Sequence, residues 1–315
     1  MTASRLDTRA SAPLDPPAMH GWIIIDKPVG PGSTRIVSAV KRALKLGGYG
    51  KYKVGHGGTL DPLASGVLPI ALGEATKTVP FVMDGRKEYR FTIRFGEARS
   101  TEDAEGEVTA SSDARPTDEA IRGALGAFRG EIDQRPPAFS ALKIDGQRAY
   151  DLARAGEVVE MKLRRARIDR LEFLARPDED HADFVVACGK GTYIRSLGRD
   201  LALALGTVGH LSALRRTAAG PFREEQAISL PKLEALGHIP ALFGALVPVV
   251  TALDDIPALA LTEAQADRLR HGQPVLLTRD APPSGALVRA ESDGKLVALV
   301  RSDGVSLQPV RVFNL

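Results

Sequence analysis

The sequence predicts an α+β fold followed by a small β-rich module. Strand-like and helix-like segments follow one another irregularly between residues 21 and 222, without the repeated strand–helix–strand order of a parallel α/β sheet. After a seam with prolines near both ends (246–258), the pattern changes to one short helix and four short strands. With 315 residues and 43% apolar content, the chain can also bury a sizeable core.

The first two expected elements are a strand and a helix. Residues 21–28 (GWIIIDKP) form an apolar run that Pro28 ends, as in a short buried strand. In residues 34–46 apolar residues recur at helical spacing, which predicts a helix that Gly47–Gly48 ends. Its N-cap is expected at Ser33 or Thr34.

The middle of the chain contains the clearest strand. In residues 87–95 (KEYRFTIRF) Tyr89 shares one face with Phe91, Ile93 and Phe95, and polar residues occupy the other face. Thr117 is expected to cap a helix at 117–128. The neighbouring expectations are a strand at 66–72, a helix at 74–83 interrupted near Pro80, and a strand, an Asp-Gly turn and a helix over 140–156.

The remaining segments complete the larger domain and form the module. We expect a strand pair at 164–176 and 182–191, a helix at 192–206 capped by Thr192, and a strand at 210–222. The module should contain a helix at 262–272 and strands at 274–278, 285–291, 295–301 and 309–315. These patterns divide the chain into a tail expected to be disordered (1–18), a large domain (19–248) and the terminal module (252–315).

Composition narrows the class of protein. The single cysteine, Cys188, excludes an internal disulfide and a cysteine-rich zinc site, and it fits a reducing compartment. No apolar run is long enough to span a membrane, and the first twenty residues lack the apolar core of a signal peptide, so we expect a cytoplasmic protein. The net charge is only +3, but residues 27–60 hold seven Lys/Arg and no acid, and residues 188–223 form a second basic stretch. A single charged stretch is usually only a solvated face. Two separate basic stretches, one of them beside a glycine-rich loop, raise the odds of a polyanionic partner.

The segment GHGGTLDPLASG (55–66) sets four glycines around one acid, Asp61. It lacks the Gly-x-x-x-x-Gly-Lys-Ser/Thr pattern of a phosphate-binding loop and the complete Gly-x-Gly-x-x-Gly of a dinucleotide-binding loop. The chain also has no Gly-x-Ser-x-Gly element, which excludes an esterase site. On composition alone, an ordinary surface loop in which Asp61 caps a turn remains an alternative.

Residues 55–77 (GHGGTLDPLASGVLPIALGEATK) closely resemble the signature of the TruB family of tRNA pseudouridine synthases. The resemblance covers about residues 19–230 and departs from the family after Asp26-Lys27-Pro28, where VGPGSTR carries an extra residue. It implies a mixed, largely antiparallel sheet with flanking helices, and the terminal module looks like an RNA-binding PUA domain. Further segments match family blocks in the same order: 21–30, 87–108, 134–156, 189–206 and 210–222.

The resemblance implies an isomerase that converts the uridine at position 55 in the T loop of tRNA to pseudouridine. Asp61 would be the nucleophile, Arg195 would pair with it and keep it ionised, and Tyr89 would stack on the flipped target base. Such a reaction implies no cofactor and no metal, because no redox change or net group transfer occurs. The expected partner is the T-arm stem-loop of tRNA, with no obligate protein partner.

Further residues are expected to contact RNA or to support the site. His56 matches a histidine that fills space vacated by flipped bases, Leu214 lines the base pocket, and Lys27 supports the active-site loop. The set also includes Gly57 from the glycine-rich loop and Lys53 and Lys190 from the basic stretches. We interpret the glycines as leaving room for the ribose near Asp61.

Two alternatives remain at this point. One is an RNA-binding or tRNA-folding protein that has the same fold without catalysis; the joint presence of Asp61, Tyr89 and Arg195 argues against it. The other is a relative that works with guide RNA and accessory proteins. The chain lacks the long lysine-rich tails expected of that relative, which favours a stand-alone enzyme.

Overall fold

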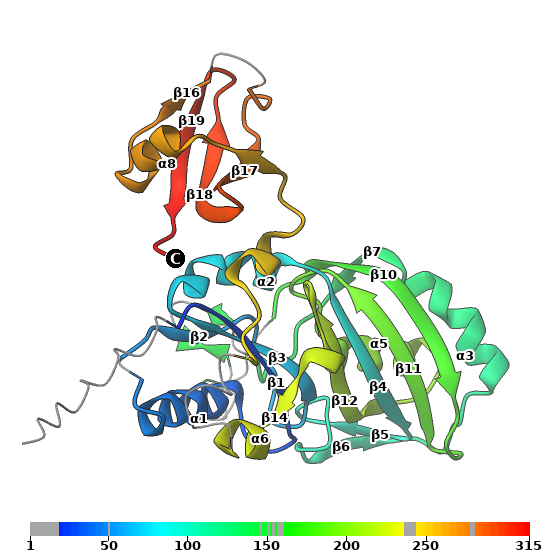
Figure 1. Cartoon of the computed structure of the whole chain (residues 1–315). Helices are drawn as coiled ribbons and strands as arrows, with labels where there is room; N and C mark the ends of the chain where they lie inside the picture. The colour runs from blue at the N-terminus through cyan, green and yellow to red at the C-terminus, as the bar shows by residue number, and fades with distance from the viewer. Residues whose placement is uncertain are drawn as a thin grey trace, which may run out of the picture.

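Two sheets organise the chain, one in the larger body and one in the C-terminal module (Figure 1). The computed structural model describes residues 19–315 except 50, 141, 145–146, 150–151, 153–154, 156–160, 236–243 and 278–280. The tail at 1–18 and most of the turn and helix expected at 145–156 lie outside the described residues. Within the described part of the chain, no helix is long and apolar enough to cross a membrane.

The larger sheet is mixed and largely antiparallel, as expected. Its main path runs β14-β1-β3-β12-β4-β11-β10-β7, with β2 paired to β3 and β13 paired to β12. Only the β1–β14 and β3–β12 pairs are parallel among its described strands. The strands are β1 (Gly21–Lys27), β2 (Val54–His56), β3 (Ser65–Leu72), β4 (Lys87–Phe95), β7 (Gly130–Gln134), β10 (Arg164–Ala175), β11 (His181–Cys188), β12 (Gly209–Ala219), β13 (Phe222–Arg223) and β14 (Ile228–Ser229).

Short helices and two small hairpins surround this sheet. The hairpins pair β5 (Glu97–Arg99) with β6 (Val108–Ser111) and β8 (Lys143–Ile144) with β9 (Gln147–Arg148). The α-helices of this body are α1 (Ser33–Leu46), α2 (Val79–Asp84), α3 (Asp118–Ala124), α5 (Ile194–Ala204) and α6 (Leu230–Ala235). Tighter 3₁₀ turns are η1 (Gly73–Thr78), η2 (Leu125–Phe128), η3 (Glu224–Gln226) and η4 (Val249–Leu253).

Three expected helix starts differ from the structure. The N-cap of α1 is Gly32; Ser33 instead bonds the glycine-rich loop, because its hydroxyl donates to the Leu60 carbonyl at 3.0 Å and accepts the Leu60 N–H at 2.8 Å. The N-cap of α5 is Tyr193, since the hydroxyl of Thr192 donates to the Gly189 carbonyl. Pro80 does not interrupt a helix: it lies in the first turn of α2, where its missing N–H costs nothing. Thr117 does cap α3, by accepting the Ala120 N–H.

Two of the apolar clusters in the core of this body meet near the middle of its sheet. One packs α5 and α3 against β4, β10 and β11, and the other packs α1 against β1 and β3. Tyr89 and Leu214, on the adjacent strands β4 and β12, contact both clusters. The two side chains therefore lie between the two halves of the body.

The C-terminal module is a five-stranded sheet with one helix, α8 (Glu263–Arg270). The sequence analysis missed the first strand of the module, which begins at Ala258, the last residue of the seam, and it placed the last strand three residues too late. The strands, in the order β15-β17-β18-β19-β16, are β15 (Ala258–Ala260), β17 (Leu287–Ser292), β18 (Lys295–Ser302), β19 (Ser306–Val312) and β16 (Val275–Leu276).

The module is fastened to the larger body at η1. The Lys77 ammonium donates to the Val312 carbonyl at 2.7 Å, and the Asn314 N–H donates to the Glu74 carboxylate at 2.8 Å. Phe313 is buried in an apolar cluster that also contains Trp22 of β1. Both polar and apolar contacts thus fix the end of the chain against the body.

Candidate active site

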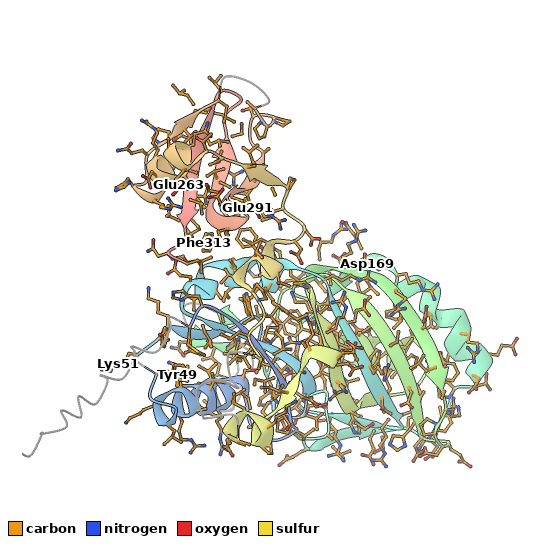
Figure 2. All side chains as sticks on the ribbon, in the orientation of Figure 1. Tyr49, Lys51, Asp169, Glu263, Glu291 and Phe313 are labelled. Atoms are coloured by element: carbon orange, nitrogen blue, oxygen red, sulfur yellow. The ribbon has the colours of Figure 1, made fainter. Side chains whose placement is uncertain are left out.

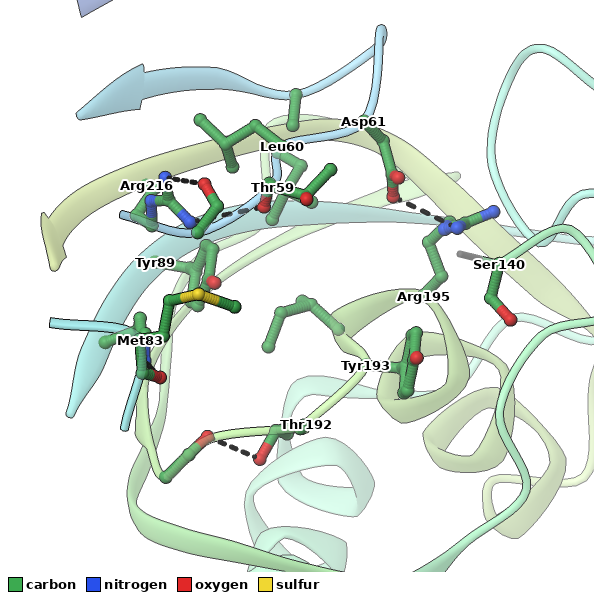
Figure 3. A pocket seen from close by; sticks show the side chains of 17 residues that line it. Thr59, Leu60, Asp61, Met83, Tyr89, Ser140, Thr192, Tyr193, Arg195 and Arg216 are labelled. Atoms are coloured by element: carbon green, nitrogen blue, oxygen red, sulfur yellow. Dashed lines mark hydrogen bonds and ion pairs between the residues drawn. The ribbon is translucent and has the colours of Figure 1, made fainter. Parts of the chain in front are cut away.

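A cavity of about 300 Å³ lies between the glycine-rich loop and the start of α5 (Figure 3). Four of the residues expected at the site line it: Asp61, Tyr89, Arg195 and Leu214. Its wall also includes residues that the sequence analysis did not single out: Thr59, Met83, Lys87, Tyr193 and Arg216 among them. The structure thus brings together side chains from segments that are far apart in the sequence.

Strand register aligns three cationic or aromatic side chains in one row. Tyr89 of β4 is paired with Arg216 of β12, Arg216 with Gly66 of β3, and Gly66 with Lys27 of β1. Paired residues on neighbouring strands point to the same face of a sheet. The row therefore places Tyr89, Arg216 and Lys27 on one face of the sheet.

Asp61 and Arg195 form the central ion pair of the site. An Asp61 carboxylate oxygen lies 3.0 Å from Nη2 of Arg195, and Figure 3 shows the two side chains facing each other. The Arg195 side chain is only 7% exposed, whereas that of Asp61 is 41% exposed. Arg195 also donates to the carbonyls of Thr101 at 2.9 Å and Phe139 at 2.8 Å, which fixes its guanidinium. A rigid, buried cation thus holds a carboxylate that is open to a ligand.

A second carboxylate, Asp103, lies behind Arg195. Its side chain is 2% exposed, and one oxygen lies 3.5 Å from Nη1 of Arg195. The Glu105 N–H donates to the other oxygen of Asp103 at 3.1 Å, as does the Thr101 hydroxyl. The sequence analysis missed Asp103, because it is one of eight acids in residues 97–119 and nothing local marks it as buried.

Packing within the protein accounts for two of the four loop glycines, Gly57 and Gly66. The interpretation that the loop glycines leave room for the ribose stays a prediction. A Cβ on Gly57 would lie 2.9 Å from Val82 and 3.2 Å from Trp22, and one on Gly66 would lie 2.2 Å from the Arg216 carbonyl oxygen. Gly66 also has φ +97°, a conformation that side chains rarely adopt. Of the loop glycines only Gly58 lines the cavity, and its Cβ position is 3.5 Å from Arg216.

Lys27 fastens the loop that carries Asp61. The side chain is fully buried, and its ammonium donates to the carbonyls of Pro28 at 2.9 Å, Pro62 at 3.3 Å and Ala64 at 2.5 Å. Burial lowers the pKa of Lys27 to about 8, although the nearby Asp61 charge opposes that shift. The hydrogen bonds of the buried Lys27 ammonium thus fix the backbone on the C-terminal side of Asp61.

Arg216 is a buried arginine that the sequence analysis did not single out. It is 1% exposed and donates to the carbonyls of Val67 at 2.7 Å, Gly58 at 3.0 Å and Thr59 at 3.3 Å. Strand alternation could have revealed it, since Arg216 must face the same way as Leu214 two residues earlier. Its neighbour Arg215 faces the other way, toward Asp26 at 2.9 Å and Glu224 at 3.0 Å.

Desolvation shifts two further groups. Burial raises the pKa of the Tyr89 phenol, so Tyr89 is protonated at neutral pH. Burial, assisted by the Arg216 charge, lowers the pKa of His56, which keeps that imidazole neutral. The Gly58 N–H lies 3.4 Å from Nδ1 of His56, a long hydrogen bond at best.

Five residues of the set expected to contact RNA or support the site do not line the cavity: Lys27, described above, and His56, Gly57, Lys53 and Lys190. His56 ends β2 half-buried, and Gly57 is buried against Val82 and Trp22. Lys53 is exposed directly before β2. Lys190 is exposed beside the cavity-lining Gly189 and Gly191 and lies 3.1 Å from Asp84, an exposed pair that contributes little stability. Within the described residues, no group of three or more His, Cys, Asp or Glu is arranged to hold a metal ion.

Family models match almost the whole chain. Residues 41–194 match the TruB family pseudouridylate synthase N-terminal domain, and residues 195–254 match the tRNA pseudouridylate synthase B C-terminal domain. Residues 256–314 match the C-terminal domain of tRNA pseudouridine synthase II. The three matches follow one another along the chain with hardly a gap.

Relatives and solved structures agree with these models. The tRNA pseudouridine synthase B of Bradyrhizobium diazoefficiens is 55% identical over 94% of this chain and 86% of its own, and that of Rhodospirillum rubrum is 52% identical over 95% and 97%. A chain in the crystal structure of a Cbf5-Nop10-Gar1 complex has a TM-score of 0.72 and 30% identity, over 94% of this chain and 85% of its own.

Proposed function

The chain belongs to the TruB family of pseudouridine synthases, and from that membership we propose that it isomerises the uridine at position 55 in the T loop of tRNA. The observation that carries the proposal is the Asp61–Arg195 ion pair, with Asp61 open to the cavity and Arg195 fixed beneath it. Relatives above 50% identity are named tRNA pseudouridine synthase B, whereas the Cbf5 chain is 30% identical. This difference favours a stand-alone tRNA enzyme over the alternative that works with guide RNA and accessory proteins.

Asp61 acts as the nucleophile of this reaction. Its carboxylate attacks C1′ of the target ribose as the N1–C1′ bond breaks, and the freed uracil turns within the cavity. A C5–C1′ bond then replaces the bond to Asp61, the proton at C5 leaves, and N1 gains a proton. The sum is an isomerisation, so no oxidant, reductant or acceptor is needed. Arg195 holds the Asp61 carboxylate aimed at the ribose.

The cavity holds one flipped nucleotide. Its size lies at the lower end of the range for small-ligand pockets, which fits a single base with its ribose. Tyr89, protonated and half-buried, stacks on the base, and Leu214 forms an apolar contact beside it. Arg216 and Lys27 position the loop rather than the substrate.

The proposed partner is the T-arm stem-loop, in the cytoplasm and without an obligate protein partner. Lys190, at the rim of the cavity, and Lys53 contribute salt-dependent phosphate contacts, and His56 fills space left by flipped loop bases. Residues 19–248 form the catalytic domain and residues 252–315 a PUA-like RNA-binding module. A binding or folding protein without catalysis is the alternative, and it gives no reason for the open Asp61 carboxylate.

Tritium release from a T-arm stem-loop labelled at C5 of the target uridine tests this function. Wild type should release tritium, and Asp61→Asn and Asp61→Ala should bind the RNA with no release above background. Release by Asp61→Ala at a rate near wild type would reject Asp61 as nucleophile. Tight binding by all three proteins without any release would favour the non-catalytic alternative.

A further inference from the structure

A second cavity, of about 450 Å³, lies at the far end of α1 from the catalytic loop. We call it the Lys–Tyr pocket; it is lined by Lys41, Leu44, Lys45, Tyr49, Lys51, Tyr52 and Val54. Figure 2 shows Tyr49 and Lys51 beside α1. None of the residues that line it also lines the catalytic cavity.

The pocket has an apolar, aromatic floor and a cationic rim. Leu44 and Tyr49 are buried in the cluster beneath α1, and Tyr52 is half-buried against the same cluster. The Tyr52 ring meets the His20 ring edge-on, with centroids 6.4 Å apart. Lys41, Lys45 and Lys51 are exposed around this floor.

The rim lysines are not neutralised by the described part of the chain. No carboxylate of a described residue lies within 4.0 Å of the ammonium of Lys41, Lys45 or Lys51. Some basic side chains elsewhere are paired; Arg165, for example, lies 3.2 Å from both Glu131 and Asp133. Lys45 lies in the last turn of α1, where it balances the helix dipole, but Lys41 and Lys51 have no such role.

We infer that the Lys–Tyr pocket binds an unpaired nucleotide of RNA, distinct from the nucleotide in the catalytic cavity. The base stacks on Tyr52 above the apolar floor, and the flanking phosphates contact Lys41, Lys45 and Lys51. An acidic peptide would use the lysines but would leave the aromatic floor unused. The aromatic floor therefore favours a nucleotide over an acidic peptide as the ligand of the pocket.

The pocket can engage the same RNA as the catalytic cavity. Ser33, at the start of α1, is hydrogen-bonded to Leu60, which precedes Asp61. The pocket lies at the other end of this 14-residue helix, which is about 20 Å long. The idea that the pocket and the catalytic cavity bind the same tRNA rests on the proposed function, whereas the binding of a nucleotide in the pocket does not.

Binding of a fluorescent oligouridylate to the full chain tests the pocket. The catalytic cavity is first saturated with unlabelled T-arm stem-loop, and binding of the probe should persist. The triple variant Lys41→Ser, Lys45→Ser, Lys51→Ser should weaken it at least about 10-fold at low salt and reduce the salt slope by about 2, as expected for three lost single-strand phosphate contacts. Tyr52→Leu, which keeps the apolar packing, should weaken it by about 10-fold.

A matched control separates this site from general electrostatics. Arg165→Ser removes an exposed charge that is already paired, and its effect should stay below twofold, against at least twofold for Lys45→Ser alone. Probe binding that stem-loop abolishes, and that Tyr52→Leu does not weaken when no stem-loop is present, would reject the inference. Equal effects of Lys45→Ser and Arg165→Ser on probe binding would also reject the inference. So would displacement of the probe by hexaglutamate, an acidic peptide, if that displacement depends on Tyr52. Absence of tritium release with intact probe binding would reject the proposed function alone.

Discussion

Replacing Asp103 by Asn tests whether a buried carboxylate behind Arg195 positions the guanidinium that faces Asp61. In the folded protein Arg195 lies between two carboxylates, with Asp61 at 3.0 Å and Asp103 at 3.5 Å. Asparagine keeps the shape of the side chain and can still accept the Glu105 N–H. The substitution therefore removes the charge of Asp103 and replaces the oxygen that faces Arg195 by an amide NH2 group, which cannot accept from the guanidinium.

The magnitude follows from the buried geometry. At 3.5 Å and an effective dielectric constant of about 20, two unit charges attract each other by about 5 kcal/mol. The introduced asparagine keeps part of the hydrogen bonding, and Asp61 still balances Arg195, so we expect a net loss of about 1.5–3 kcal/mol. If this loss falls on the transition state, single-turnover isomerisation slows about 10- to 150-fold.

Single-turnover tritium release at saturating stem-loop measures this effect. RNA affinity should change less than about twofold, because Asp103 is 2% exposed and cannot contact RNA. Asp113→Asn is the matched control, since Asp113 is an exposed acid of the same stretch. A wild-type rate for Asp103→Asn would refute the positioning role. An equal loss of RNA binding and rate would show a general structural effect instead.

Two further predictions concern the loop that carries Asp61. Gly66→Ala should lower the free energy of unfolding by about 3 kcal/mol or more, because the new Cβ would lie 2.2 Å from the Arg216 carbonyl oxygen. The control Gly55→Ala, with no described atom within 4 Å of its Cβ position, should change the free energy of unfolding by less than about 1 kcal/mol. Equal urea midpoints for the two variants would contradict this prediction. The pKa of Lys27 is about 8 in the folded protein, against the ordinary lysine value of 10.5. Between pH 8 and pH 10.5 the unfolded chain therefore keeps a proton on Lys27 that the folded chain has lost, so the free energy of unfolding should rise with pH in this range. Relative to Lys27→Met, wild type should gain up to about 3 kcal/mol from pH 8 to pH 10.5; parallel pH profiles of the two proteins in urea unfolding would refute the burial of a charged Lys27.

Local sequence patterns predicted much of the fold. Alternation in residues 87–95 gave β4 with Tyr89 on the apolar face, and helical spacing gave α1 up to Gly47. Capping was less predictable, because the hydroxyl of Ser33 has a choice of partners and the tertiary structure offered it the backbone of Leu60. The same competition moved the start of α5 from Thr192 to Tyr193.

By itself, the sequence determined the types of the main elements and, through the loop around Asp61, the family. Only the tertiary structure decided which of eight acids stands behind Arg195, why Gly57 and Gly66 must be glycines, and that Arg216 lies in a row with Tyr89 and Lys27. These facts depend on contacts between residues up to about 150 positions apart. Strand register and packing set these contacts, and no local sequence pattern encodes them.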